Sequence, residues 1–214
     1  MLNLYKKAAL TLSCALLFVA CSTKEKLYNL SPQQWYEMIL KELDKREFDK
    51  AKQYYISFSS EHINSPLLES ILLTLSSVCE KEGDYEEANA YLDQYMVRFG
   101  TYEKIEYARY LKIRVNYNSF VRPNRNQGLM KESIATIESF LNDYPNSIYK
   151  PQIQTMLVKF RLALLYLNRD ILSLYERTGR NESAKIYRQL IEQDELNKVD
   201  MIPPKLPFYR KIFE

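Results

Sequence analysis

The sequence predicts an all-α protein, a solenoid of about four helix pairs with one long helix near the C-terminus. Three observations support this prediction: few glycines, many tyrosines, and a hydrophobic stripe that recurs along the chain. The 214 residues include four glycines and eighteen tyrosines. Scarce glycine disfavours phosphate-binding loops and tight hairpins. Tyrosine suits the interface of two packed helices, where the ring is buried and the hydroxyl reaches the edge.

The clearest copy of the stripe follows two turn residues, Gly83 and Asp84. Its members are spaced three or four residues apart, as one face of an α-helix requires: Tyr85, Ala88, Leu92, Tyr95 and Phe99. The same spacing recurs earlier at Phe48, Ala51, Tyr55, Phe58 and His62, and later at Ser133, Ile137, Phe140 and Tyr144. Gly179, Ala184 and Ile191 repeat part of it again. Units of roughly 34 to 48 residues are typical of tetratricopeptide and related helical repeats.

The first twenty residues are expected to be an export signal. Lys6 and Lys7 give it a basic start, and residues 8–20 are apolar. This stretch is too short to cross a bilayer comfortably, because a spanning helix needs about 20 apolar residues. It ends in Leu17-Phe18-Val19-Ala20-Cys21. That order resembles the box of bacterial lipoproteins, although Phe18 stands where leucine is usual.

Cys21 is therefore the expected lipidation site and the new N-terminus. Several acyl chains on one cysteine hold a soluble domain at a membrane, and Ser22 resembles lipoproteins forwarded to the outer membrane. The alternative is an ordinary signal peptide with an incidental cysteine. The expected divisions are a lipoprotein signal peptide, a lipidated tether, a helical repeat domain and a proline-rich C-terminal tail, at 1–20, 21–31, 32–199 and 200–214.

Capping residues and helix-breaking residues predict where the helices begin and end. Ser31-Pro32 combines a capping residue with proline in the first turn, which predicts a helix start. Asn64-Ser65-Pro66 interrupts the helical pattern and caps the following helix. Residues 118–128 form a polar loop that is too long for a plain repeat turn, and such a loop is either functional or disordered. Five expected helices cover residues 32–45, 48–60, 67–81, 151–177 and 182–196. Three more are expected: one that follows Asp84 and reaches Phe99, one that begins at Tyr102 and one that begins near Met130.

The helix expected over 151–177 is the longest. At 1.5 Å per residue it measures near 40 Å, about twice a standard repeat helix, so we expect it to extend beyond its own pair. The tail after it, residues 201–214, contains three prolines and many apolar side chains. We expect this tail to fold back over the last helix pair. The alternative is that it is a docking strip for a partner.

The sequence does not predict an enzyme or a cofactor. The single histidine, His62, lies on a helical stripe and is expected to be a packed ring. No His/Cys cluster with metal-ligand spacing and no Gly-Lys-Ser/Thr loop is present in the sequence. Cys14 leaves with the signal, and Cys79 is expected to be a buried, inert thiol. Formal charge is +3, and about +1 without Lys6 and Lys7, which disfavours nucleic acid as a partner.

Four features together resemble outer-membrane protein assembly lipoproteins of the BamD type. They are the lipoprotein box, the repeats that start soon after it, a Tyr-Pro-Asn-Ser-x-Tyr junction from Tyr144 to Tyr149, and a long helix closing in Leu-Tyr-x-Arg-x-Gly. The closing residues here are Tyr175, Arg177, Gly179, Ala184 and Arg188. Two departures stand out: Arg122-Pro123-Asn124-Arg125-Asn126 replaces an Arg-Asp-rich stretch, and the proline-rich tail replaces a fifth full repeat.

The resemblance implies a protein at the periplasmic face of the outer membrane. It implies docking on the periplasmic domains of a BamA-type barrel insertase and binding of unfolded outer-membrane proteins. In the family's Ala-x-x-x-Arg pattern the matching arginine is Arg188, and Arg177 lies nearby as a second group for an acidic partner. The alternative for each arginine is a solvated charge at a helix end.

The concave face of a helical solenoid is lined by the first helix of each pair, and such faces hold extended peptides. Candidate groove residues for unfolded barrel segments are Trp35, Tyr36 and Tyr107. The alternative for each is ordinary packing between helices. Two other functions share the anchor and the repeats: a pilotin or pilus-assembly factor, and a scaffold for peptidoglycan enzymes. Neither explains the long helix after the junction as well.

Overall fold

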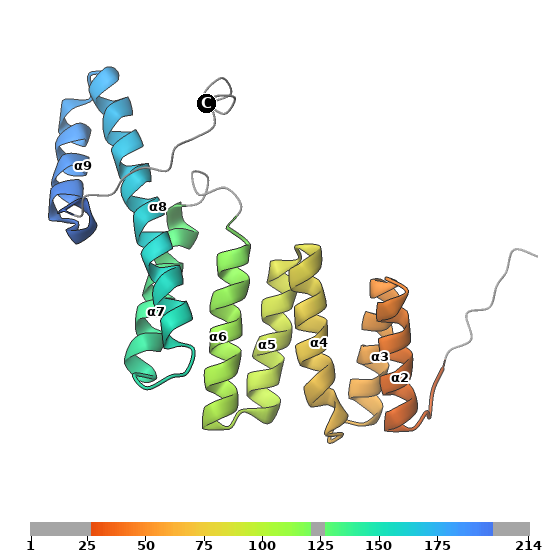
Figure 1. The fold of residues 1–214 in the computed structure, drawn as a ribbon. Helices are drawn as coiled ribbons and strands as arrows, with labels where there is room; N and C mark the ends of the chain where they lie inside the picture. Colours follow the sequence, from red (N-terminus) through yellow and green to blue (C-terminus); the bar gives the residue numbers. More distant parts are fainter. Residues whose placement is uncertain (1–26, 121–126, 199–214) are drawn as a thin grey trace, which may run out of the picture. The chain divides into compact units, whose positions relative to one another are not determined.

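The computed structural model of the chain describes residues 27–120 and 127–198, and within these ranges it contains eight α-helices, one 3₁₀ helix and no strand (Figure 1). The α-helices are α2 (Pro32–Asp44), α3 (Phe48–Glu61), α4 (Leu67–Glu82), α5 (Tyr85–Phe99), α6 (Tyr102–Asn118), α7 (Gln127–Asp143), α8 (Lys150–Arg177) and α9 (Asn181–Gln193). The 3₁₀ helix η2 (Glu195–Lys198) follows α9. The predicted all-α fold of tetratricopeptide-like helix pairs is confirmed.

The chain forms two compact units, residues 1–68 and 69–214. Unit 1 contains α2, α3 and the first residues of α4. Unit 2 contains the rest of α4 and every later helix. The signal segment, Cys21, the loop residues 121–126 and the tail from 199 onward lie outside the described residues, so the predicted boundaries of anchor, tether and tail stay predictions.

Unit 1 is a helical hairpin whose start is fixed by a capping box. The Ser31 hydroxyl accepts from the backbone N–H of Gln34, and the Gln34 side chain accepts from the backbone N–H of Ser31. The backbone N–H groups of Ser31 and Gln34, which have no partner within the helix, are thereby hydrogen-bonded. The core between the two helices includes Trp35, Ile39 and Phe58, none of which has any exposed surface.

Glu42 is a charged group inside this hairpin. It is buried among α2 and α3 and pairs with Lys45 at 3.0 Å and with Lys50 at 3.2 Å. The hydrogen bond from Lys45 lowers the pKa of the Glu42 carboxyl, against the opposing effect of its burial. The two lysines, each about half exposed, therefore let this carboxylate remain charged although its own side chain is only 7% exposed.

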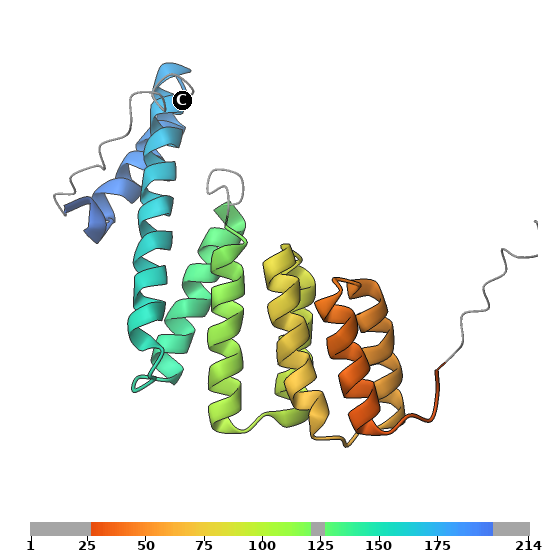
Figure 2. The same cartoon turned by 45° about the vertical axis from the view of Figure 1, so that its right-hand side comes forward.

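Unit 2 repeats the hairpin in order. Helix α5 packs on α6, α7 on α8, and α8 on α9, and α4 lies beside α5 in both views (Figures 1 and 2). The two glycines that the repeat pattern singled out, Gly83 and Gly179, have φ of +85° and +71°. Only glycine adopts this left-handed region without strain, so both turns depend on it. Asp84 then caps α5 by accepting from the Glu87 N–H.

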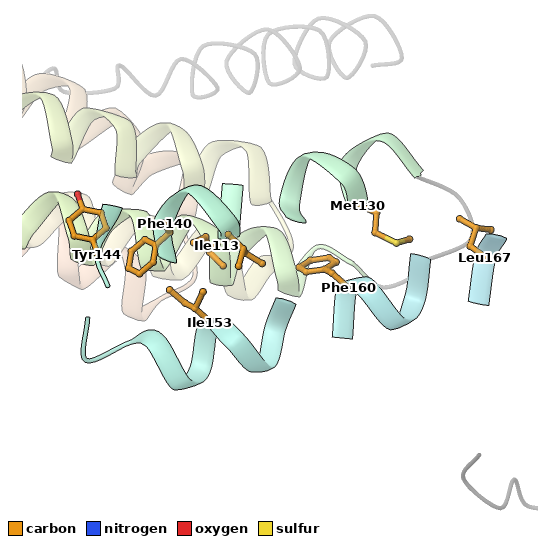
Figure 3. Packing of buried hydrophobic residues seen from close by; sticks show 8 residues of the cluster. Ile113, Met130, Phe140, Tyr144, Ile153, Phe160 and Leu167 are labelled. Carbon is orange, nitrogen blue, oxygen red and sulfur yellow. The ribbon is translucent and has the colours of Figure 1, made fainter. Parts of the chain in front are cut away.

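A hydrophobic core in unit 2 joins α6, α7 and α8 (Figure 3). Ile113 comes from α6, Phe140 from α7, Tyr144 from the residue that follows α7, and Ile153 and Phe160 from α8. The repeat stripe expected in α7 is confirmed, because all of its members are buried: Ser133, Ile137, Phe140 and Tyr144. The stripe therefore marks the face of each return helix that points into the core.

Helix α8 has 28 residues and α7 has 17, so α8 continues beyond its partner. That continuation carries α9 and η2, as the length of the predicted helix implied. Leu165 of α8 is fully buried although it is not part of the core shared with α6 and α7, and α8 also packs on α9 and η2.

Two predicted helix ends differ from the structure. Helix α7 starts at Gln127, earlier than the expected start near Met130. Helix α9 ends at Gln193, before the expected end near Leu196. The N–H of Leu196 donates to the Asp194 carboxylate at 2.9 Å, and the chain continues as the 3₁₀ helix η2. None of the helices within the described ranges combines the length and the apolar character that crossing a membrane takes.

Candidate functional site

Trp35 and Tyr36 differ sharply in exposure. Trp35 is fully buried, and its indole N–H donates to Glu61 Oε2 at 2.8 Å. Its ring also lies 5.8 Å from that of Tyr54. Trp35 thus belongs to the core of unit 1 and presents no ring on a surface. Tyr36, the next residue on α2, is partly exposed.

Tyr107 is part of a group of three tyrosines in unit 2, which we name the tyrosine cluster: Tyr107, Tyr110 and Tyr149. The rings of Tyr110 and Tyr149 are stacked, with centroids 4.3 Å apart and planes 8° from parallel. The Tyr107 centroid lies 5.8 Å from that of Tyr149 and 6.4 Å from that of Tyr110. All three residues are partly exposed, so the cluster is an accessible aromatic surface.

The Tyr-Pro-Asn-Ser-x-Tyr junction places Tyr149 against α6. The chain turns after Tyr144, where the N–H of Ser147 donates to the Tyr144 carbonyl at 3.1 Å. The Ser147 hydroxyl then accepts from the N–H of Tyr149 at 3.1 Å. Tyr149 becomes the residue that precedes α8, with its ring on Tyr110. The junction that carried the family resemblance therefore builds one side of the cluster.

The cluster is held in place by polar contacts at its edge. The Tyr110 hydroxyl donates to Gln152 Oε1 at 2.7 Å. Burial, with the charge of Glu106 nearby, raises the pKa of Tyr149. The phenol therefore stays neutral at physiological pH, and its hydroxyl remains a hydrogen-bond donor as well as an acceptor. The cluster offers flat rings and neutral hydroxyls, which suits aromatic and backbone groups of a bound chain.

Sequence reasoning missed Tyr110 and Tyr149 as members of this surface. The spacing of Tyr107 and Tyr110, three residues apart on one helix, was a readable signal. The position of Tyr149 beside them could not be predicted from the sequence, because it depends on how the junction turns the chain.

Arg177 and Arg188 both lie near the turn between α8 and α9. Arg177 is the last residue of α8, is exposed, and has no ion-pair partner among the described residues. Arg188 on α9 donates to Glu176 Oε1 on α8, and both side chains are about half-exposed. Arg180 in the same turn lies over the ring of Tyr175, 5.9 Å from its centroid. The turn therefore presents several guanidinium groups on one end of unit 2.

His62 is a packed residue, as expected. Its Nε2 lies 2.7 Å from the Leu30 carbonyl oxygen, and its ring is 6.0 Å from that of Phe58. An open cavity of about 610 Å³ lies beside it in unit 1, lined by residues 31–33 and 61–67. Within the described ranges, no three His, Cys, Asp or Glu side chains come together in a way that would hold a metal ion.

Known proteins resemble this chain over most of its length. Residues 28–192 match a family model described as YfiO, outer membrane lipoprotein. A protein of Helicobacter pylori named outer membrane protein assembly factor BamD is 33% identical to this chain over 208 residues. The alignment covers 96% of this chain and 94% of that relative.

Proposed function

Because the chain belongs to the YfiO family of outer-membrane lipoproteins, we propose that it acts as an assembly factor for outer-membrane β-barrel proteins. It is an outer-membrane lipoprotein, anchored through lipid and facing the periplasm. The single observation that carries the proposal is the match over nearly the full length of both this chain and the assembly factor of H. pylori. Lipidation at Cys21 is part of the proposal.

The proposed docking end for a BamA-type insertase is the turn between α8 and α9, with Arg177 and Arg188 as its contacts. A planar guanidinium binds carboxylates through two parallel hydrogen bonds, which favours an acidic partner surface. Arg188 is already oriented by Glu176, and an exposed pair of this kind contributes little stability by itself. An acidic group of the partner therefore replaces Glu176 at low cost.

The proposed substrate surface is the tyrosine cluster, with Tyr36 of unit 1 as a second candidate contact. Segments of unfolded barrel proteins are alternating and rich in aromatic residues, and stacking on partly exposed rings holds them without a deep pocket. Each aromatic pair contributes roughly 0.5–1.5 kcal/mol, so binding is weak and reversible, as transfer to an insertase requires. Trp35 takes no part in this proposal because its ring is buried.

We further propose that the protein works as a scaffold and catalyses no reaction. Its proposed contacts with barrel proteins and with the insertase are all non-covalent, and it requires no cofactor. The pilotin and cell-wall alternatives draw on the same anchor and repeats, but the relative's name favours barrel-protein assembly.

The docking proposal is tested by affinity capture from detergent-solubilised envelopes with the tagged full-length chain. Arg188→Glu reverses the charge at the proposed contact. Arg161→Glu is the matched control, because Arg161 forms a similarly exposed pair with Glu138 elsewhere on α8. We expect the wild-type chain and Arg161→Glu to recover the barrel insertase and Arg188→Glu to lose it. Recovery of a secretin or of peptidoglycan enzymes without insertase would overturn the assembly role.

The substrate proposal is tested with a synthetic strand peptide that alternates aromatic and polar residues. We expect Tyr107→Ala and Tyr110→Ala to weaken its binding to the full chain severalfold. Tyr102→Ala, on the same helix but outside the cluster, serves as the control. Equal loss in all three variants would assign the effect to general destabilisation and reject the cluster as the binding surface.

A further inference from the structure

A glutamate without a partner lies beside the tyrosine cluster. Glu106 on α6 is partly exposed, and it forms no hydrogen bond or ion pair with any other residue that the structure describes. The two cations nearest to it along α6 are engaged with other carboxylates: Lys104 pairs with Glu69 at 2.7 Å, and Arg109 pairs with Asp143 at 2.8 Å. Glu106 therefore presents a carboxylate that pairs with no cation of the described chain.

Helix geometry places this carboxylate next to the rings. At about 100° per residue, Glu106, Tyr110 and Tyr107 follow one another within roughly 100° of the helix circumference. Glu106 and Tyr110 are four residues apart, so they are neighbours on one side of α6. Tyr149 stacks on Tyr110. After burial and the neighbouring Tyr107, the charge of Glu106 contributes to the raised pKa of Tyr149. The carboxylate and the stacked rings thus belong to one surface.

An aromatic surface with a carboxylate at its edge matches the chemistry of an arginine side chain. The faces of aromatic rings attract cations, and a planar guanidinium also stacks on them. Its N–H groups can at the same time donate two parallel hydrogen bonds to a carboxylate. Lysine offers a compact, strongly hydrated charge without the flat contact. The tyrosine cluster together with Glu106 therefore favours a guanidinium.

Two further cations near the cluster donate their hydrogen bonds elsewhere. Arg114 lies about two turns further along α6, and its guanidinium donates to Glu80 at 3.2 and 2.6 Å. Lys150, at the start of α8, donates to the Pro145 carbonyl at 2.9 Å. Neither side chain contacts Glu106 directly, so the carboxylate is left for a cation of a bound partner.

We infer that the tyrosine cluster and Glu106 together form a subsite for one arginine side chain of a bound, extended chain. The inference rests on the proposed substrate surface and adds a charge requirement to it. The guanidinium lies against the rings while its N–H groups donate to the Glu106 carboxylate. Alternate side chains of a strand point to the same face. An arginine two positions from an aromatic residue therefore brings both side chains to the cluster together.

The test compares two synthetic strand peptides that differ in one side chain. Both alternate aromatic and polar residues. One carries arginine two positions from an aromatic residue, and the other carries citrulline there, which has a similar planar shape without the charge. Isothermal titration calorimetry measures the affinity of each peptide for the full chain. We expect the arginine peptide to bind about fivefold more tightly. Glu106→Gln should remove this preference and leave the affinity for the citrulline peptide unchanged.

Glu132→Gln on α7 is the matched control, because Glu132 is exposed, belongs to the same unit and lies outside the tyrosine cluster. This substitution changes the net charge by the same amount, and it should keep the preference for arginine. The unchanged affinity of Glu106→Gln for the citrulline peptide also shows that this variant is folded.

Three results would overturn the inference. Equal affinities of the two peptides for the wild-type chain would remove the subsite, and the substrate surface would stand if Tyr107→Ala still weakened both peptides. A preference for arginine that persists in Glu106→Gln would assign recognition of the charge to another group. Failure of both peptides to bind the wild-type chain would reject the substrate surface itself, and the subsite with it.

Discussion

Removing the carboxylate of Glu80 should destabilise unit 2 far more than removing an exposed carboxylate on the same unit. Glu80 on α4 accepts from Arg114 Nε at 3.2 Å and Nη2 at 2.6 Å, and from Asn118 Nδ2 at 2.7 Å. The Glu80 side chain is 9% exposed and that of Arg114 34%. This hydrogen bond with Glu80 raises the pKa of Arg114. One carboxylate thus ties α4 to both donors on α6.

The expected cost follows from that geometry. Hydrogen bonds to charged groups each contribute roughly 1.5–3 kcal/mol, and breaking a fully buried pair costs roughly 3–5 kcal/mol. Because a third of the Arg114 side chain reaches solvent, water replaces part of the loss. We therefore expect Glu80→Ala to lower the free energy of unfolding by about 2–3 kcal/mol. Glu138→Ala, which breaks the exposed pair with Arg161, should cost about 0–1 kcal/mol.

Urea unfolding of the full chain, followed by far-ultraviolet circular dichroism, measures both variants. A double-mutant cycle with Arg114→Ala isolates the coupling between the two side chains. Equal losses for Glu80→Ala and Glu138→Ala, or a coupling energy near zero, would refute the argument that burial makes this pair strong. A loss confined to Glu80→Ala supports it.

Three further outcomes follow from local geometry. Gly83→Ala should lower stability by about 1–2 kcal/mol in urea unfolding, because φ of +85° strains any side chain. Burial raises the pKa of Tyr95 to about 12, so Tyr95 should be among the last tyrosines to ionise in an ultraviolet titration. Because the folded state favours the neutral phenol, the free energy of unfolding should fall as pH rises from about 10 to 12. The lowered pKa of Glu42 means that its contribution is present above the ordinary value of 4.5 and is lost as pH falls through its lower folded value. Glu42→Gln should therefore reduce the acid sensitivity of unit 1, measured by acid unfolding.

Most helices were predictable because short-range chemistry sets their ends. Proline at Pro32 and the positive-φ turns at Gly83 and Gly179 fix starts and stops that the sequence shows directly. The hydrophobic stripes predicted the buried faces because residues spaced three or four apart lie on one face of a regular helix. The end of α9 escaped prediction because a side-chain contact from Asp194 decides it.

The candidate surfaces were harder to predict, since they depend on contacts between distant residues. Trp35 is buried in the core of unit 1, where Glu61 on the next helix accepts its indole N–H. Tyr149 joins Tyr110 only through the geometry of the junction before α8. Helix α8 packs on α9 and η2 as well as on α7, and a single hydrophobic stripe cannot predict buried residues on a second side, such as Leu165. Spacing identifies a helix face, but it does not say which neighbour covers that face.

The most direct test of the central claim is depletion of this lipoprotein in its native bacterium. Folded β-barrel proteins of the outer membrane are then quantified by their resistance to unfolding in cold detergent. Folded barrels should fall in parallel with the lipoprotein, and the wild-type chain should restore them. The Arg188→Glu chain, present at equal abundance, should not restore them. Normal levels of folded barrels after depletion, with loss of secretin assemblies or of cell-wall integrity, would contradict the assembly role.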